Sequence, residues 1–184
     1  MNIVSVLVGV SIAGIATPQV VDMSLQPIYA SKRAQNFAVA ESTAGGLISA
    51  ALLSFPGASN YYAGGGVVYT LNSRIEIAGV SPEEYKNYRG TTEEMLASLV
   101  NSMRQKIGAD WCIGESGIAG PAGGRSNHTK GRTVIGISGP INKTITIETE
   151  TLDRETNMIE FTTESLIFLR DTIHESEDSY NIKT

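Results

Sequence analysis

Cysteine and histidine are scarce in this sequence, which has one cysteine and two histidines among 184 residues. A single cysteine excludes a disulfide within the chain, and so few potential ligands exclude the usual Cys/His zinc patterns. Cys112 lies in the apolar run Trp111-Cys112-Ile113, which is typical of a buried strand thiol. We therefore expect a protein that needs no metal and no other cofactor.

Basic residues are also few. The 14 Lys and Arg residues are scattered singly, and the net charge is −5 with a pI near 5.1. A nucleic-acid partner requires a basic patch or stripe, so this distribution argues against one. A small anionic ligand stays compatible with the sequence, because a few local donors are enough to bind it.

Long apolar runs are absent as well. Residues 1–16 carry no charged side chain, but the apolar run within them, residues 6–16, is shorter than the about 20 residues of a membrane helix. No Lys or Arg precedes this run, as one would in an export signal. We therefore expect a cytoplasmic protein without a membrane partner, in which residues 1–16 form an apolar N-terminal extension.

The length and the 41% hydrophobic content predict one domain over residues 1–184. Apolar runs predict strands, and apolar residues at helical spacing predict helices. Strands interleaved with helices indicate an α/β layered domain with a mixed sheet. The expected strands cover residues 37–40, 64–70, 111–115, 133–138 and 144–151, and the expected helices cover 17–33, a segment from about 45, 92–107 and a segment through 159–173.

The clearest of these helices follows Thr91-Thr92-Glu93-Glu94, which offers a capping box, and ends at Gly108. Residues 175–184 lack the apolar spacing of the preceding helix. We expect them to form a mobile polar tail.

Three glycine-bearing segments, residues 41–46, 64–69 and 115–124, each follow or enter a predicted strand. In an α/β sheet the loops after the strands converge on one crevice, where free backbone N–H groups can hold an anion. We expect such an anion at residues 44–46 or 117–124. The alternative is that the glycines only form tight turns. No segment has the GxGxxG or GxxxxGK[ST] pattern of a known phosphate-binding loop.

Taken together, these segments resemble one family. Residues 40–47, AESTAGGL, are similar to the A-E-S-C-T-G-G-L motif of the CinA C-terminal domain family, the nicotinamide-nucleotide amidases. Residues 116–124, SGIAGPAGG, are similar to its [ST]-G-I-A-G-P-x-G-G loop, and residues 65–69 to its G-x-V-x-Y element. Asp153-Arg154 resembles the family's G-D-R, with Leu152 in place of the glycine. The order and spacing agree from about residue 40 to residue 154.

The resemblance implies a single three-layer α/β/α domain that is usually found as a homo-oligomer. It also implies hydrolysis of the carboxamide of nicotinamide mononucleotide to nicotinate mononucleotide and ammonia. By position, Ser42 is the nucleophile or water-positioning hydroxyl, and Tyr69 is a hydrogen-bonding residue of the same site. The implied substrate-binding residues are Glu41, Gly45, Gly46, Ser116, Gly117, Gly120, Gly123, Gly124 and Arg154.

One departure from the family bears on catalysis. Where the family has a lysine taken to be the catalytic base, five residues after the tyrosine, this sequence has Arg74. An arginine effectively cannot lose its proton, so a catalytically inactive homologue that binds a nucleotide, another anion or a protein partner is the alternative to an enzyme. His128 is the candidate for a substitute base. For Ser42, the alternative to catalysis is a helix N-cap.

Overall fold

The computed structural model describes residues 35–54, 57–121 and 130–181. The predicted helix over 17–33, the apolar extension over 1–16, His128, Gly123 and Gly124 lie outside these residues. The elements in chain order are β1 (Phe37–Glu41), α2 (Leu47–Leu53), η1 (Ala58–Asn60), β2 (Tyr62–Val67), α3 (Leu71–Glu76), η2 (Pro82–Tyr85), α4 (Glu93–Ile107), β3 (Trp111–Ile118), β4 (Arg132–Ser138), β5 (Lys143–Glu148) and α5 (Arg154–Asn181).

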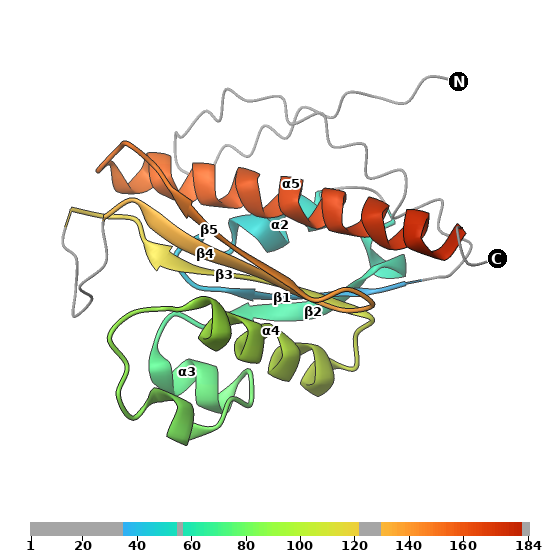
Figure 1. Ribbon diagram of the computed structural model, residues 1–184, viewed down its shortest axis with the longest axis horizontal. Coiled ribbons are helices and arrows are strands. Elements are labelled where there is room, and N and C mark those ends of the chain that lie inside the picture. Colours follow the sequence, from blue (N-terminus) through green and yellow to red (C-terminus); the bar gives the residue numbers. More distant parts are fainter. Residues whose placement is uncertain (1–34, 55–56, 122–129, 182–184) are drawn as a thin grey trace.

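The sheet has the strand order β2-β1-β3-β4-β5. β1 is parallel to both β2 and β3, whereas β4 and β5 are antiparallel to their neighbours, so the sheet is mixed. α2 and α5 cover one face of the sheet, and α3 and α4 lie on the other (Figure 1). The predicted three-layer α/β/α fold is therefore confirmed.

Alternation along β1 separates two apolar cores. Phe37 and Val39 pack with residues of α2 and α5, whereas Ala38 and Ala40 face the cluster formed with α4. All five residues of β1 are buried, which explains why the first four, Phe37 to Ala40, are apolar without interruption. The sheet is thus covered on both faces, and β1 is an interior strand between β2 and β3.

Two glycines allow α4 to approach the sheet closely. Gly114 on β3 and Gly136 on β4 are register partners beneath the helix. A Cβ at Gly114 would lie 2.5 Å from Val100 Cγ1, and a Cβ at Gly136 would lie 3.2 Å from Leu96 Cγ. A larger side chain at Gly114 would therefore require α4 or the Val100 side chain to shift.

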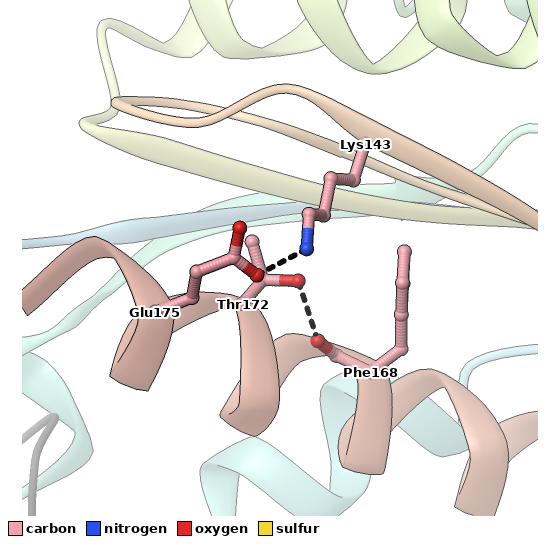
Figure 2. Close-up of polar contacts among 4 residues, drawn as sticks. All are labelled: Lys143, Phe168, Thr172 and Glu175. Carbon is pink, nitrogen blue, oxygen red and sulfur yellow. Dashed lines mark hydrogen bonds and ion pairs between the residues drawn. The ribbon is translucent and has the colours of Figure 1, made fainter. Parts of the chain in front are cut away.

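The C-terminal helix ends later than the sequence predicts. Residues 175–181, expected to be a polar tail, continue α5 to Asn181. No glycine or proline occurs from residue 154 onward, so nothing in the sequence stops the helix. Lys143 on β5 forms an ion pair with Glu175, and Thr172 Oγ1 donates a hydrogen bond to the Phe168 carbonyl oxygen at 2.8 Å (Figure 2).

Two further differences concern the site. α3 was not predicted, because its six residues are too few to show a helical period. β2 ends at Val67, so Tyr69 lies beyond the strand rather than within it.

The glycine beneath α4 gives a stability prediction. We expect Gly114→Ala to lower the free energy of unfolding by about 1–3 kcal/mol, because the added methyl overlaps a stiff valine side chain. The control is Gly66→Ala, where a Cβ would meet Ile77 Cγ2 at an ordinary 3.5 Å. Urea unfolding of both variants measures the difference, and equal losses would contradict close packing as the cause.

Candidate functional site

Arg74 joins two serines at the carboxyl ends of neighbouring strands. Ser42 directly follows β1, and Ser116 lies near the end of β3. Arg74 Nη2 donates to Ser42 Oγ at 3.2 Å and to Ser116 Oγ at 2.7 Å, and its Nε donates to the Val68 carbonyl oxygen at 3.2 Å. The three side chains are only 2–4% exposed. The structure therefore brings together three of the residues that the sequence analysis selected.

The hydrogen-bonded chain continues beyond Ser116. Ser116 Oγ lies 2.7 Å from Thr91 Oγ1, which in turn lies 3.1 Å from the Tyr88 hydroxyl. Thr91 is thus a site residue and not part of a capping box. The N-cap of α4 is Thr92, and the third residue after it is Met95, which has no carboxylate to complete a box, so that prediction was wrong.

A cavity of about 590 Å³ adjoins Arg74. Its described lining combines aromatic rings with three cationic side chains and contains no carboxylate. Such a lining suits a flat ligand that carries negative charge. The lining residues are Tyr69, Thr70, Leu71, Arg74, Tyr85, Lys86, Tyr88 and Arg89.

Arg154, the first residue of α5, contacts Tyr69 of the cavity lining. Arg154 Nη2 donates to the Tyr69 hydroxyl at 3.4 Å, and Tyr69 is 57% exposed. A Cβ at Gly120 would lie 3.4 Å from Arg154 Nη1, so the arginine lies across this glycine. The structure thus groups three more of the predicted residues, at the exposed side of the site.

Glu41 has a different role from the one that the resemblance implied. Its buried carboxylate accepts hydrogen bonds from the backbone N–H groups of Gly46 and Ile48 at 2.9 Å and of Ser49 at 2.8 Å. Glu41 therefore caps α2, and it does not line the described cavity. The N-cap position of α2 is Gly46, so the alternative that Ser42 is the N-cap was wrong.

The backbone N–H groups of residues 44–46 are all hydrogen bonded within the protein. The N–H of Ala44 donates to Glu115 Oε2 at 2.7 Å, that of Gly45 to the Ser42 carbonyl oxygen at 3.3 Å, and that of Gly46 to Glu41. The anion expected at residues 44–46 is therefore not supported by the structure. At Gly117 the N–H donates to Thr43 Oγ1 at 2.9 Å and is engaged as well.

Glu115 is a second buried carboxylate beside Glu41, its register partner in the sheet. Burial raises the pKa of Glu115, and hydrogen bonds from Thr133 and Ala44 oppose this, while the charge of Glu41 adds to it. Glu115 Oε1 accepts from Thr133 Oγ1 at 2.7 Å. The Glu115 carboxyl on β3 therefore links the loop after β1 to β4, and both of its oxygens are hydrogen bonded.

Within the described ranges, no group of three or more His, Cys, Asp or Glu side chains is placed to hold a metal ion. None of the helices in the described part of the chain has the length and apolar character that a bilayer crossing requires.

Comparison with known proteins identifies the family. The sequence model of the CinA C-terminal domain matches residues 24–173. The chain belongs to this family, which confirms the resemblance found in the motifs.

Curated relatives carry the same family name. A CinA-like protein of Prochlorococcus marinus (strain MIT 9301) is 39% identical over 118 residues, which are 64% of this chain and 28% of that protein. A CinA-like protein of Acidobacterium capsulatum is 36% identical over 126 residues, which are 68% of this chain and 30% of that protein. The chain thus spans less than a third of the length of these relatives.

Solved structures share the fold. The competence-damaged protein (CinA) superfamily protein from Enterobacter cloacae is 27% identical, with a TM-score of 0.72 over 81% of this chain and 86% of that one. The competence or damage-inducible protein from Enterobacter asburiae is 25% identical, with a TM-score of 0.74 over 80% of this chain and 92% of that one.

The sequence analysis missed the residues that surround Arg74. Tyr85 ends η2, and Tyr88 and Thr91 lie between η2 and α4, in a segment without a recognised motif. The doubled threonine before α4 was the one available signal, because a single threonine suffices for the cap.

The buried Glu115 carboxyl predicts a pH effect on stability. Because its pKa is raised above its ordinary value of 4.5, the unfolded chain releases this proton first as the pH rises. The contribution of Glu115 to the free energy of unfolding is therefore fully present below pH 4.5 and is lost as the pH rises through the folded pKa. In Glu115→Gln this loss disappears, so we expect the stability of the parent to fall relative to the variant as the pH rises above 4.5, by up to about 1.4 kcal/mol per pH unit.

Urea unfolding across this pH range tests the effect. Glu94→Gln is the control, because hydrogen bonds from its own backbone N–H and from Thr92 lower the pKa of Glu94 and give any effect the opposite sign. Parallel pH profiles for the parent and Glu115→Gln would contradict a raised pKa.

Proposed function

We propose that the protein deamidates nicotinamide mononucleotide to nicotinate mononucleotide and ammonia. The observation that carries the proposal is the contact of Arg74 Nη2 with both Ser42 Oγ and Ser116 Oγ beside the cavity. Membership of the CinA C-terminal domain family and the position of Ser42 at the end of a parallel strand support it.

Amide hydrolysis requires an oxygen nucleophile, a proton for the leaving ammonia and donors for the oxyanion. In this proposal Ser42 supplies the nucleophile or positions a water molecule. Arg74 holds the serine oxygen and stabilises negative charge on the carbonyl oxygen, because its guanidinium is a permanent donor.

The cavity lining suits a pyridine nucleotide. The tyrosine rings offer flat surfaces for the base, and Lys86, Arg89 and Arg154 supply positive charge for the phosphate. Assembly into a homo-oligomer, which the family resemblance implied, stays a prediction.

A second candidate function is nucleotide binding without turnover. In the described part of the chain, the Ser42 hydroxyl is hydrogen bonded to Arg74 and to no group that accepts a proton. Arginine stays protonated throughout the physiological pH range. An anion-binding protein of the same fold needs no base at this position.

The first test is Ser42→Ala. We expect the variant to lose any release of ammonia from nicotinamide mononucleotide by about 100-fold or more, because the reacting hydroxyl is gone. The free energy of unfolding should fall by no more than about 3 kcal/mol, because the change removes one hydrogen bond to a charged group. A coupled ammonia assay and urea unfolding measure the two effects, and Ser49→Ala on α2 serves as the control serine. Unchanged turnover in Ser42→Ala would make the serine structural.

The second test is Arg74→Lys, which separates the two candidate functions. If the protein is an enzyme limited by the lack of a base, a desolvated lysine restores proton transfer and should raise kcat, within the about 10²- to 10⁴-fold range of such groups. If the protein only binds, lysine cannot copy the hydrogen bonds of Arg74 Nε and Nη2, and affinity should fall without turnover. Arg89→Lys, at the same cavity, is the control for a change of cation alone. A fast parent that Arg74→Lys slows would assign Arg74 itself to the reacting site.

A further inference from the structure

Thr91 is buried beside Arg74 and belongs to none of the motifs found in the sequence. The residue is 6% exposed, and its Oγ1 lies 2.7 Å from Ser116 Oγ and 3.1 Å from the Tyr88 hydroxyl oxygen. The Thr91 carbonyl oxygen accepts a hydrogen bond from Arg132 Nη1 on β4 at 3.2 Å. The sheet therefore holds the backbone of Thr91, while its hydroxyl contacts the candidate site.

Both partners of this hydroxyl also contact the Arg74 guanidinium. Ser116 Oγ accepts a hydrogen bond from Arg74 Nη2 at 2.7 Å. The guanidinium carbon lies 5.9 Å from the centre of the Tyr88 ring, within the distance at which a cation and an aromatic ring attract each other. The Thr91 hydroxyl thus lies between the hydrogen-bond acceptor of the guanidinium and the ring beside it.

Ser116 depends on Thr91 for its second contact. The serine is 2% exposed, and within the described residues its Oγ is bonded to Arg74 and to Thr91. A serine side chain has three staggered rotamers, and two contacts select one of them more strictly than one contact does. Loss of the Thr91 hydroxyl would therefore leave the Ser116 rotamer less fixed.

The position of Ser116 affects Ser42 because one nitrogen of Arg74 contacts both serines. An arginine Nη atom carries two N–H bonds in the plane of the guanidinium. Nη2 donates to Ser116 Oγ at 2.7 Å and to Ser42 Oγ at 3.2 Å, so the contact with Ser116 is the shorter one. Since the guanidinium is rigid and planar, a displacement of Nη2 toward another Ser116 rotamer changes its contact with Ser42.

Thr92, the next residue, has a structural role. It is the N-cap of α4, and its side chain accepts a hydrogen bond from the Met95 N–H at 3.3 Å. Its side chain also hydrogen bonds to Glu94, and within the described ranges it forms no hydrogen bond with a residue of the site. The doubled threonine thus supplies one hydroxyl to the helix and one to the site.

We propose that Thr91 is a positioning residue whose hydroxyl, through Ser116, holds the Arg74 guanidinium in contact with Ser42. For its effect on turnover the proposal rests on the proposed function, whereas the effect on Arg74 itself does not depend on that function.

The test compares Thr91→Val with Thr92→Val. Valine has nearly the shape of threonine, so each variant removes one hydroxyl and keeps a β-branched side chain. Both should lower the melting temperature by a similar amount, about 2–4 °C, because each loses about one hydrogen bond. In an ammonia-release assay with nicotinamide mononucleotide, Thr91→Val should lower kcat by about 10- to 100-fold, because the reacting groups are misplaced. KM should change little, since Lys86 and Arg89 at the cavity are unaltered, and Thr92→Val should leave both constants unchanged.

Two further variants test the route of the effect. Thr91→Ser keeps the hydroxyl and should retain most of the turnover. Ser116→Ala removes the group through which Thr91 acts, so adding Thr91→Val to it should cost little further turnover. Equal kcat for Thr91→Val and Thr92→Val, equal losses in Thr91→Ser and Thr91→Val, or additive losses with Ser116→Ala would each overturn the proposal.

A second measurement does not depend on turnover. Arg74 Nε donates to the Val68 carbonyl oxygen at 3.2 Å in a buried position, so its N–H should exchange slowly with solvent. The NMR signal of this group is assigned by its absence in Arg74→Lys. We expect it to exchange about 10-fold faster in Thr91→Val than in Thr92→Val, because the guanidinium loses a fixed acceptor.

Failure of the proposed function gives a different result. If the parent chain releases no ammonia from nicotinamide mononucleotide, the deamidase function fails, and the exchange comparison alone decides on the positioning of Arg74. Faster exchange in Thr91→Val than in Thr92→Val supports the role of Thr91. Equal exchange rates in the two variants overturn it, whether or not the parent is active.

Discussion

The buried guanidinium of Arg74 is the interaction on which the arrangement of the site depends. It bonds to Ser42 after β1, to Ser116 on β3 and to Val68 after β2, so one side chain ties together the ends of three parallel strands. A cation this deeply buried is costly unless it is well hydrogen bonded. Hydroxyl and carbonyl oxygens and two tyrosine rings provide that environment, while no carboxylate among the described residues neutralises the charge. The site is therefore folded around a positive charge that a ligand can balance.

The two buried carboxylates in the described part of the chain, Glu41 and Glu115, do not neutralise Arg74. They accept hydrogen bonds from the loop after β1 and from the start of α2. Glu41 and Glu115 accept the backbone N–H groups of Gly46, Ile48, Ser49 and Ala44, which are the donors that a phosphate-binding loop would offer to its ligand. The N–H donors of the glycine-rich segment after β1 are thus satisfied within the protein, by these carboxylates and, at Gly45, by the Ser42 carbonyl oxygen. The cationic side chains of the described part of this site are instead found at the cavity that Arg74 and the tyrosines line.

Local sequence patterns predicted most of the helices and strands, but they did not show what each residue of the site contacts. The order of most strands and helices along the chain follows from apolar spacing, which depends on neighbouring residues only, whereas the three layers were implied by the family resemblance. The motifs placed Ser42, Ser116 and Arg154, but they could not show that Glu41 caps α2 or that Thr91 contacts Ser116 25 positions away. Such contacts are made across the fold and leave no local pattern. The extent of α5 was also underestimated, because apolar spacing ends at Ile173 whereas the helix continues without it.

Arg74, which stands where the family has a lysine, changes the chemistry that the site can perform. A lysine can exchange its proton and so takes part in proton transfer, and its single nitrogen can rotate away. Arginine keeps a constant charge and a fixed planar set of donors, and here Nε and Nη2 bond to Val68, Ser42 and Ser116. Arg74 therefore fixes the two serine hydroxyls in place and gives the adjoining cavity a permanent positive charge, whereas a lysine would have offered fewer fixed donors and a proton to exchange.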